Sequence, residues 1–156
     1  MQQEKNNALK RILCYLPALI CMAVIFWLSS RNAEESAQQS GIVLEWLISI
    51  FGDNILTDFI VRKLAHCLEF TGLCVLFNLG FVLDRKKLMI IQSILLTSAY
   101  AATDEFHQLF VSGRSCELKD WAIDTCGAVI GSIVFAVIYK AVKRIAQKRS
   151  KKAIQH

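Results

Sequence analysis

The sequence predicts an all-α fold, a polytopic membrane helical bundle with four transmembrane helices and an interfacial or re-entrant helix between the first and the second. Three observations carry this prediction. Hydrophobic residues make up 54% of the 156-residue chain, they gather in long uncharged runs, and most basic residues flank these runs on one side. The predicted spans are residues 12–30, 64–83, 88–108 and 121–139, which with a basic tail at 140–156 form one predicted domain, 1–156.

The first predicted span holds 19 residues, Ile12 to Ser30, without a charge, close to the roughly 20 that a helix needs to cross a hydrocarbon core. A cleaved signal peptide is the alternative, because basic residues precede the run. The run is longer than the usual apolar region of such peptides, and Leu28 to Arg31 is a poor cleavage site. Pro17 is compatible with a membrane helix. The segment is therefore interpreted as a retained helix.

A polar stretch, residues 31–40, follows the first span and is expected to leave the bilayer. Residues 41–51 are apolar again, but they include Glu45 and number only about ten, so they suit an interfacial or re-entrant helix better than a crossing. Gly52 to Asn54 predicts a turn. Apolar residues then recur at helical spacing, so the next helix is expected to begin near Thr57.

The other three spans become long enough to cross a membrane only by including polar residues at one end. The second span admits His66 and Glu69, the third admits Asp104 and Glu105, and the fourth admits Asp124. A charge deep in lipid is costly, so an ionisable residue there is a candidate for function.

The distribution of basic residues predicts the orientation. With these spans, 13 of the 18 Lys and Arg residues fall in the N-terminal segment, in the turn at 85–87 and in the C-terminal tail. Because an excess of basic residues in short loops faces the cytoplasm, both termini are expected to be cytoplasmic in a multi-pass protein of the cell membrane. The expected partner of the basic tail is the lipid bilayer, and the positive net charge therefore does not call for nucleic acid.

Cysteine and glycine spacing add two smaller predictions. Five of the six cysteines lie within predicted spans, and no CxxC spacing occurs, so zinc and redox motifs have little support. Cys116 lies in an outer loop, and a disulfide between Cys116 and Cys67 stays an open alternative. Gly127 and Gly131 are four residues apart and form a small-residue face, for which packing within the chain is favoured over a dimer contact.

Three ionisable residues on three helices are predicted to lie at one depth. His66, Asp104 and Asp124 are separated from the cytoplasmic ends of their helices by 17, 16 and 15 residues. At about 1.5 Å per residue, these offsets put all three roughly 23 to 26 Å from that side, just inside the outer interface. Helical spacing lets further polar groups share the same faces. The candidate catalytic residues are His66, Glu69, Asp104, Glu105, His107, Asp120 and Asp124, and the candidate substrate-binding residues are Arg114 and Gln108.

Each of these residues also has a structural interpretation. The two histidines can be satisfied core residues, Asp104 and Arg114 can form an ion pair, and Asp120 can cap a helix. Arg62 and Lys63 are interpreted as interface anchors. Three aromatic residues are interpreted as an interfacial belt: Trp46, Phe106 and Trp121. The agreement in depth among three helices favours a substrate or ion site over a set of independent structural roles.

The run from Asp104 to Gly127 reads DEFHQLFVSGRSCELKDWAIDTCG. It resembles the signature of VanZ-like membrane proteins. Upstream, the family's Lys-x-x-His-x-x-Glu segment is similar to RKLAHCLEF at residues 62–70, and its serine-rich exit from the first helix is similar to residues 27–40. The likeness covers nearly the whole chain. The positions that match are the nine candidate residues named above.

The resemblance implies a cell-envelope function, and the family's namesake is associated with resistance to the glycopeptide teicoplanin. The leading hypothesis is an outer-leaflet site that binds or modifies a lipid-linked or cell-wall-related anionic group, with Arg114 holding the anion. His66 or His107 would act as acid or base, and the carboxylates would tune them or bind a divalent cation. Mixed ligands of this kind suit Zn or Mn, but no spacing supports a particular metal, so the cofactor stays undefined.

Two other classes of function stay open. A non-catalytic binding or sequestering protein needs the anion pocket but no proton transfer. A small transporter fits less well, because four helices offer little room for alternating access and no pair of corresponding broken helices is apparent. The sequence decides neither whether the protein is an enzyme nor its oligomeric state.

Overall fold

The computed structural model describes residues 1–51 and 57–154 and contains five helices and no strand within them. This confirms the all-helical fold class. The predicted turn at 52–54 lies outside the described residues. The helices are α1 (Gln2–Ser29), α2 (Ala33–Phe51), α3 (Asp58–Arg85), α4 (Ile90–Gln108) and α5 (Leu118–Ile154).

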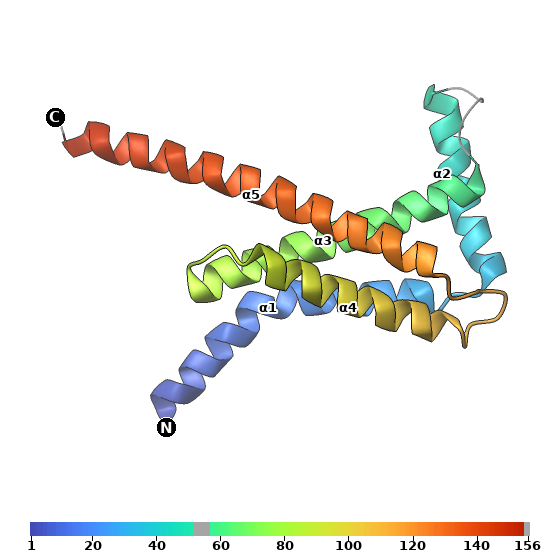
Figure 1. Ribbon diagram of the computed structural model, residues 1–156, viewed down its shortest axis with the longest axis horizontal. Coiled ribbons are helices and arrows are strands. Elements are labelled where there is room, and N and C mark those ends of the chain that lie inside the picture. The colour runs from blue at the N-terminus through green and yellow to red at the C-terminus, as the bar shows by residue number, and fades with distance from the viewer. Residues whose placement is uncertain (52–56, 155–156) are drawn as a thin grey trace.

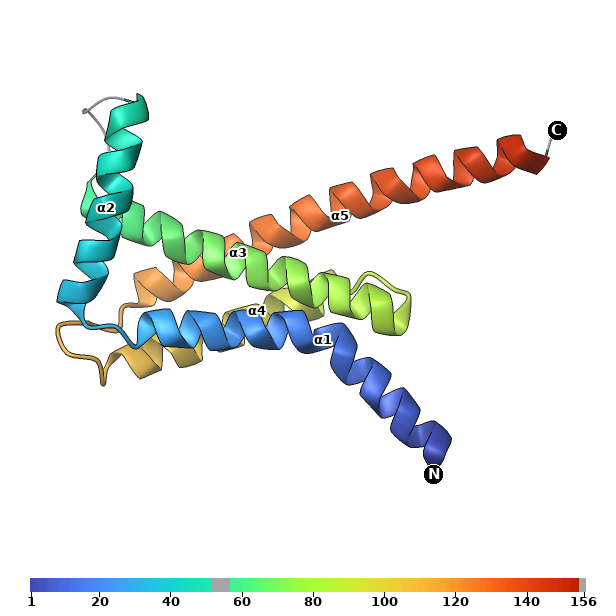
Figure 2. The same cartoon turned by 180° about the vertical axis from the view of Figure 1, so that it is seen from behind.

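Local hydrogen bonds explain where the helices begin and end. The Thr57 hydroxyl accepts a bond from the Ile60 amide at 3.3 Å, so Thr57 is the N-cap of α3, which confirms the predicted start. Lys86 ends the same helix in the left-handed conformation. Pro17 lies inside α1, and because it cannot donate to the Leu13 carbonyl, it accounts for the bend of α1 in Figures 1 and 2.

The helix predicted for residues 41–51 is longer in the structure. It begins at Ala33 and has 19 residues, so the polar stretch before Gly41 is largely helical. Asn32 explains the earlier start, because its side-chain oxygen accepts a hydrogen bond from the Glu35 amide at 2.8 Å. Glu34 and Glu35 then occupy the first turn, where negative charge stabilises a helix.

The central helix is α3, which packs against each of the other four. Figures 1 and 2 show α5 crossing the middle of α3 at an angle and α2 crossing one end of it, while α4 and part of α1 lie alongside α3. Both chain termini and the turn from α3 to α4 lie toward the opposite end. The buried core joins α1, α3 and α4 and contains Ala18, Ile25, Phe70, Leu73, Phe77 and Ala101.

The closest helix pair is α3 with α5. A Cβ atom added at Gly127 would collide with the Cys67 carbonyl oxygen, and one at Gly131 would collide with the Thr71 carbonyl oxygen. The Thr71 hydroxyl donates to the carbonyl oxygen of Gly127 at 2.9 Å. Small residues allow this approach of two backbones. The prediction that this glycine pair packs within the chain is confirmed.

Three of the described helical segments are long and apolar enough to cross a membrane: Leu9–Ser29, Asp58–Arg85 and Leu118–Lys151. The predicted third span corresponds to α4, which is not among them because hydroxyl residues and two acids interrupt its apolar run. Many large apolar side chains face outward from the bundle, including Ile91, Ile133 and Val137. Apolar exposure on this scale is typical of a protein surrounded by lipid.

All six cysteines are free thiols, so the disulfide between Cys67 and Cys116 that the sequence left open does not form. The predicted belt residues Trp46 and Phe106 are exposed, and the Trp121 indole donates to the Ser98 carbonyl oxygen at 3.1 Å.

Candidate functional site

Two neighbouring cavities lie near the end of the bundle that α2 crosses. The polar cavity, about 100 Å³, lies among α3, α5, the end of α4 and the loop between α4 and α5. The apolar cavity, about 160 Å³, lies between α2 and α3 and reaches the end of α1. Three residues line both cavities, and they therefore form the wall between them: Arg62, His66 and Arg114.

Backbone geometry in the loop at 109–117 positions Arg114. Gly113 precedes it with φ +76°, a conformation that favours glycine. A Cβ atom at Gly113 would lie 2.9 Å from the Ala33 Cβ, and the Ala33 amide donates to the Ser112 carbonyl oxygen at 3.2 Å. The loop is thus held against the start of α2, and Arg114 turns toward the two cavities.

The Arg114 guanidinium is half-buried and incompletely paired. Its Nε atom is buried without a hydrogen-bond partner, and the described residues place no carboxylate within ion-pair distance of it. Burial lowers the pKa of Arg114 from its usual value and the charge of Arg62 lowers it further, while Asp104, Glu69 and Glu105 oppose this shift. A guanidinium stays protonated under such conditions, so a positive charge faces the cavities.

Arg62 is a functional candidate that sequence reasoning missed, because it was interpreted as an interface anchor. It lines both cavities and, within the described chain, forms no ion pair. Its neighbour Lys63 differs, since Lys63 forms an ion pair with Asp120 across the α3–α5 contact. The available signal was helical spacing, because Arg62 lies four residues before His66 and therefore on the same face of α3.

The carboxylates divide into paired and unpaired groups. Asp120 is paired with Lys63, and Glu105 accepts a hydrogen bond from the Glu117 amide at 3.1 Å, just before α5 begins. Asp124 is only 1% exposed, and the described residues supply no hydrogen-bond partner to either of its carboxylate oxygens. Since a buried carboxylate without hydrogen bonds is costly, Asp124 is the acid in the polar cavity with most to gain from a ligand.

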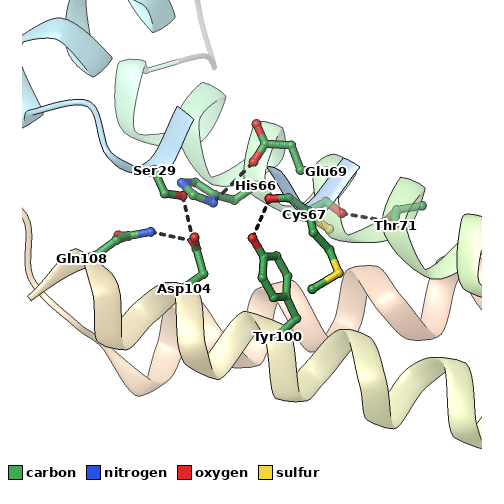
Figure 3. Close-up of polar contacts among 9 residues, drawn as sticks. Ser29, His66, Cys67, Glu69, Thr71, Tyr100, Asp104 and Gln108 are labelled. Atoms are coloured by element: carbon green, nitrogen blue, oxygen red, sulfur yellow. Dashed lines mark hydrogen bonds and ion pairs between the residues drawn. The ribbon is translucent and has the colours of Figure 1, made fainter. Parts of the chain in front are cut away.

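Asp104 is buried and lines neither cavity. Figure 3 shows Ser29 and Gln108 directed at it. Its Oδ2 atom accepts hydrogen bonds from the Ser29 hydroxyl at 2.8 Å and from the Gln108 amide at 3.0 Å. The ion pair with Arg114 that the sequence offered as an alternative is not formed. Asp104 instead holds Gln108, which lines the polar cavity.

The two candidate histidines point in different directions. His66 lines both cavities, and its Nδ1 atom lies 3.7 Å from the Glu69 carboxylate, which is beyond hydrogen-bond distance (Figure 3). This nitrogen is buried without a partner. His107 lies at the same level but faces α1, where its Nε2 atom is 3.1 Å from the Ser30 hydroxyl and its ring packs on Phe26. His107 lines neither cavity.

The described residues bring together no group of three or more His, Cys, Asp or Glu side chains arranged to hold a metal ion. Six of the nine predicted site residues line the polar cavity: His66, Glu105, Gln108, Arg114, Asp120 and Asp124. Glu69 lines the apolar cavity, and Asp104 and His107 lie outside both linings.

Comparison with known families gives a match. A sequence model described as VanZ/LLP1 matches residues 14–139, a range that includes every residue lining the two cavities. The chain belongs to the VanZ/LLP1 family. Searches of curated proteins and of solved structures found no match. Family membership and the three apolar helices together identify a VanZ-like membrane protein.

Proposed function

We propose that this VanZ/LLP1 protein crosses the cell membrane four times, with α4 as the remaining crossing and both termini in the cytoplasm. The 19 residues of α4 suffice for a crossing, and contacts with α1, α3 and α5 surround it, so its hydroxyl groups need not face lipid. The charge bias toward the end with both termini sets the orientation. In this arrangement α2 lies at the outer interface.

Labelling of Cys116 tests this topology. Cys116 is exposed in the loop between α4 and α5, which the proposal puts outside the cell. A membrane-impermeant maleimide should therefore label the protein in intact cells, and Cys116→Ser should remove the label. As a matched control, Ser150→Cys in the Cys116→Ser background should react only after permeabilisation. The reverse pattern for these two positions would overturn the orientation.

The proposed function is to hold the anionic group of a lipid-linked or cell-wall-related molecule near the outer leaflet. The observation that carries it is the pair Arg62 and Arg114, which line both cavities without ion-pair partners among the described residues. Two guanidinium groups at a cavity wall without a partner in the described part of the fold are costly unless a ligand supplies the missing anion. Arginine forks bind phosphate and carboxylate groups bidentately.

His66 supports a second function at the same place, the modification of the bound molecule. His66 lines both cavities beside the two arginines, and the described residues give its Nδ1 atom no hydrogen-bond partner. An imidazole there can give or take a proton. His66→Gln separates the two functions, because a binding protein retains its ligand after this change while an acid-base catalyst loses turnover.

A complementation experiment tests the proposed function in cells. Deletion of the gene should change the pool of lipid-linked wall precursors and the susceptibility to teicoplanin, and wild-type protein should restore both. Arg114→Ala should behave as the deletion does while its membrane abundance stays at the wild-type level. Lys119→Ala removes an exposed charge from the same end of α5 and should complement fully. Equal complementation by both variants would refute the anion site.

A further inference from the structure

The two cavities differ in chemistry on either side of their shared wall. Beyond Arg62, His66 and Arg114, the polar cavity is lined mainly by charged and amide groups. The apolar cavity is lined by uncharged polar side chains of α2, Ser36, Gln39 and Ser40, and by aliphatic side chains from three helices: Leu28, Val43, Val61 and Ala65. A molecule that fits both therefore needs a polar part joined directly to an apolar part.

Charge places the anion at the shared wall. The polar cavity is lined by four acidic side chains, Glu105, Glu117, Asp120 and Asp124. Lys63 lines it too and is paired with Asp120, so three acids are left to disfavour an anion deep within this cavity. The apolar cavity is lined by one acidic side chain, Glu69, and by the two arginines, for which the described residues supply no ion-pair partner. An anion beside Arg62 and Arg114, toward the apolar cavity, keeps the attraction and avoids most of the repulsion.

The apolar cavity is bordered by a helix that has little contact with the rest of the bundle. Within the described chain, α2 packs against α3 and against no other helix, and Figures 1 and 2 show it crossing the end of α3. Several large apolar side chains of α2 are exposed, including Ile42, Trp46 and Ile50. These side chains suit contact with lipid, so the space between α2 and α3 borders the bilayer.

We propose that the apolar cavity takes the hydrocarbon chain of a lipid phosphate monoester whose phosphate lies between Arg62 and Arg114. This inference rests on the proposed anion site and names the class of its ligand. A phosphate monoester carries about −1.5 to −2 charges at neutral pH, which matches two guanidinium groups, and its three free oxygens allow both arginines to bind at once. A soluble anion would leave the aliphatic lining unused.

Photo-crosslinking tests where the chain lies. The full-length protein is reconstituted in phosphatidylcholine vesicles with a lipid phosphate monoester that carries a diazirine in its hydrocarbon chain. Crosslinks mapped by mass spectrometry should fall on the residues of α2 and α3 that line the apolar cavity. The same chain with a neutral alcohol head should give at least about 30-fold fewer crosslinks, because it loses the charge-assisted contacts with both arginines.

Two matched tryptophan variants test the cavity itself. Ala65→Trp fills the apolar cavity and should lower the specific crosslinks by about tenfold, because overpacking leaves no room for the chain. Leu68→Trp adds a similar bulk to a side chain that is 68% exposed and lines neither cavity, so it should leave the crosslinks unchanged. Val43→Phe fills the same cavity from α2 and provides a second test.

Protection of Arg114 by inorganic phosphate against phenylglyoxal reports on the anion site alone. If phosphate protects Arg114 in both wild type and Ala65→Trp but the crosslinks fall outside the apolar cavity, the lipid inference is overturned and the anion site is retained. Crosslinks equal for phosphate and alcohol heads, without protection of Arg114, would overturn the proposed function as well. Protection together with loss of crosslinks in Ala65→Trp and Val43→Phe supports both.

Discussion

Gly131→Ala is expected to remove most of the folded protein from the membrane, whereas Gly72→Ala is expected to leave it near the wild-type level. A Cβ atom at Gly131 would collide with the backbone carbonyl oxygen of Thr71, while one at Gly72 meets no atom within 4 Å. A carbonyl within a helix cannot rotate away, so α3 and α5 would have to separate. Overpacking costs roughly 1–3 kcal/mol, and the loss of the Thr71 bond to Gly127 adds to it.

The measurement is the thermal midpoint of unfolding in detergent, combined with membrane abundance by immunoblot. Gly72→Ala controls for the loss of a glycine from a helix, because it changes helix propensity without touching a neighbour. Gly127→Ala should resemble Gly131→Ala, since its Cβ atom would collide with the Cys67 carbonyl oxygen. Equal midpoints for Gly131→Ala and Gly72→Ala would show that the α3–α5 contact is looser than described.

Most of the helices could be predicted from the sequence because apolar runs and caps are local signals. The start of α3 follows from the Thr57 cap, and an N-cap at Asn32 was equally readable before Ala33. The prediction for residues 31–40 rests on their polarity and not on this cap, and the predicted helix is therefore shorter than α2. For α4, hydropathy is a weak guide, because Thr97 and Ser93 are buried among other helices and do not face lipid.

The sequence predicts the depth of the candidate side chains in the membrane but not the direction in which each side chain points. Counting residues along a helix fixes the level of a side chain, and the six candidates that line the polar cavity gather at one end of the bundle. The rotation of each helix depends on its packing, which the count does not contain. His107 therefore shares the level of the site but faces Phe26 on α1. Arg62 was missed for a related reason, because its lack of an ion-pair partner is a property of the assembled fold.

Arg62→Ala and Lys63→Ala are expected to have opposite effects, although the two residues are neighbours on α3. Lys63 is paired with Asp120, and both side chains are less than 20% exposed. Its removal leaves a carboxylate without its partner and should lower the free energy of unfolding by about 2 kcal/mol, between the values for exposed and fully buried ion pairs, because this pair is only partly buried. Arg62 has no such partner among the described residues, and its charge acts against that of Arg114. Its removal should therefore leave stability unchanged or raised.

Ligand binding should show the reverse order. Arg62→Ala and Arg114→Ala should each weaken the binding of a lipid phosphate monoester by about 30-fold, or 2 kcal/mol, the value of a charge-assisted hydrogen bond. Lys63→Ala should change it little once the variant is folded. Thermal unfolding and equilibrium binding on the same purified proteins measure both quantities. An arginine kept for a ligand destabilises the ligand-free protein and stabilises only the protein with ligand bound. If Arg62→Ala or Arg114→Ala lowers the free energy of unfolding of the ligand-free protein, that arginine therefore has a structural role and not a ligand-binding one.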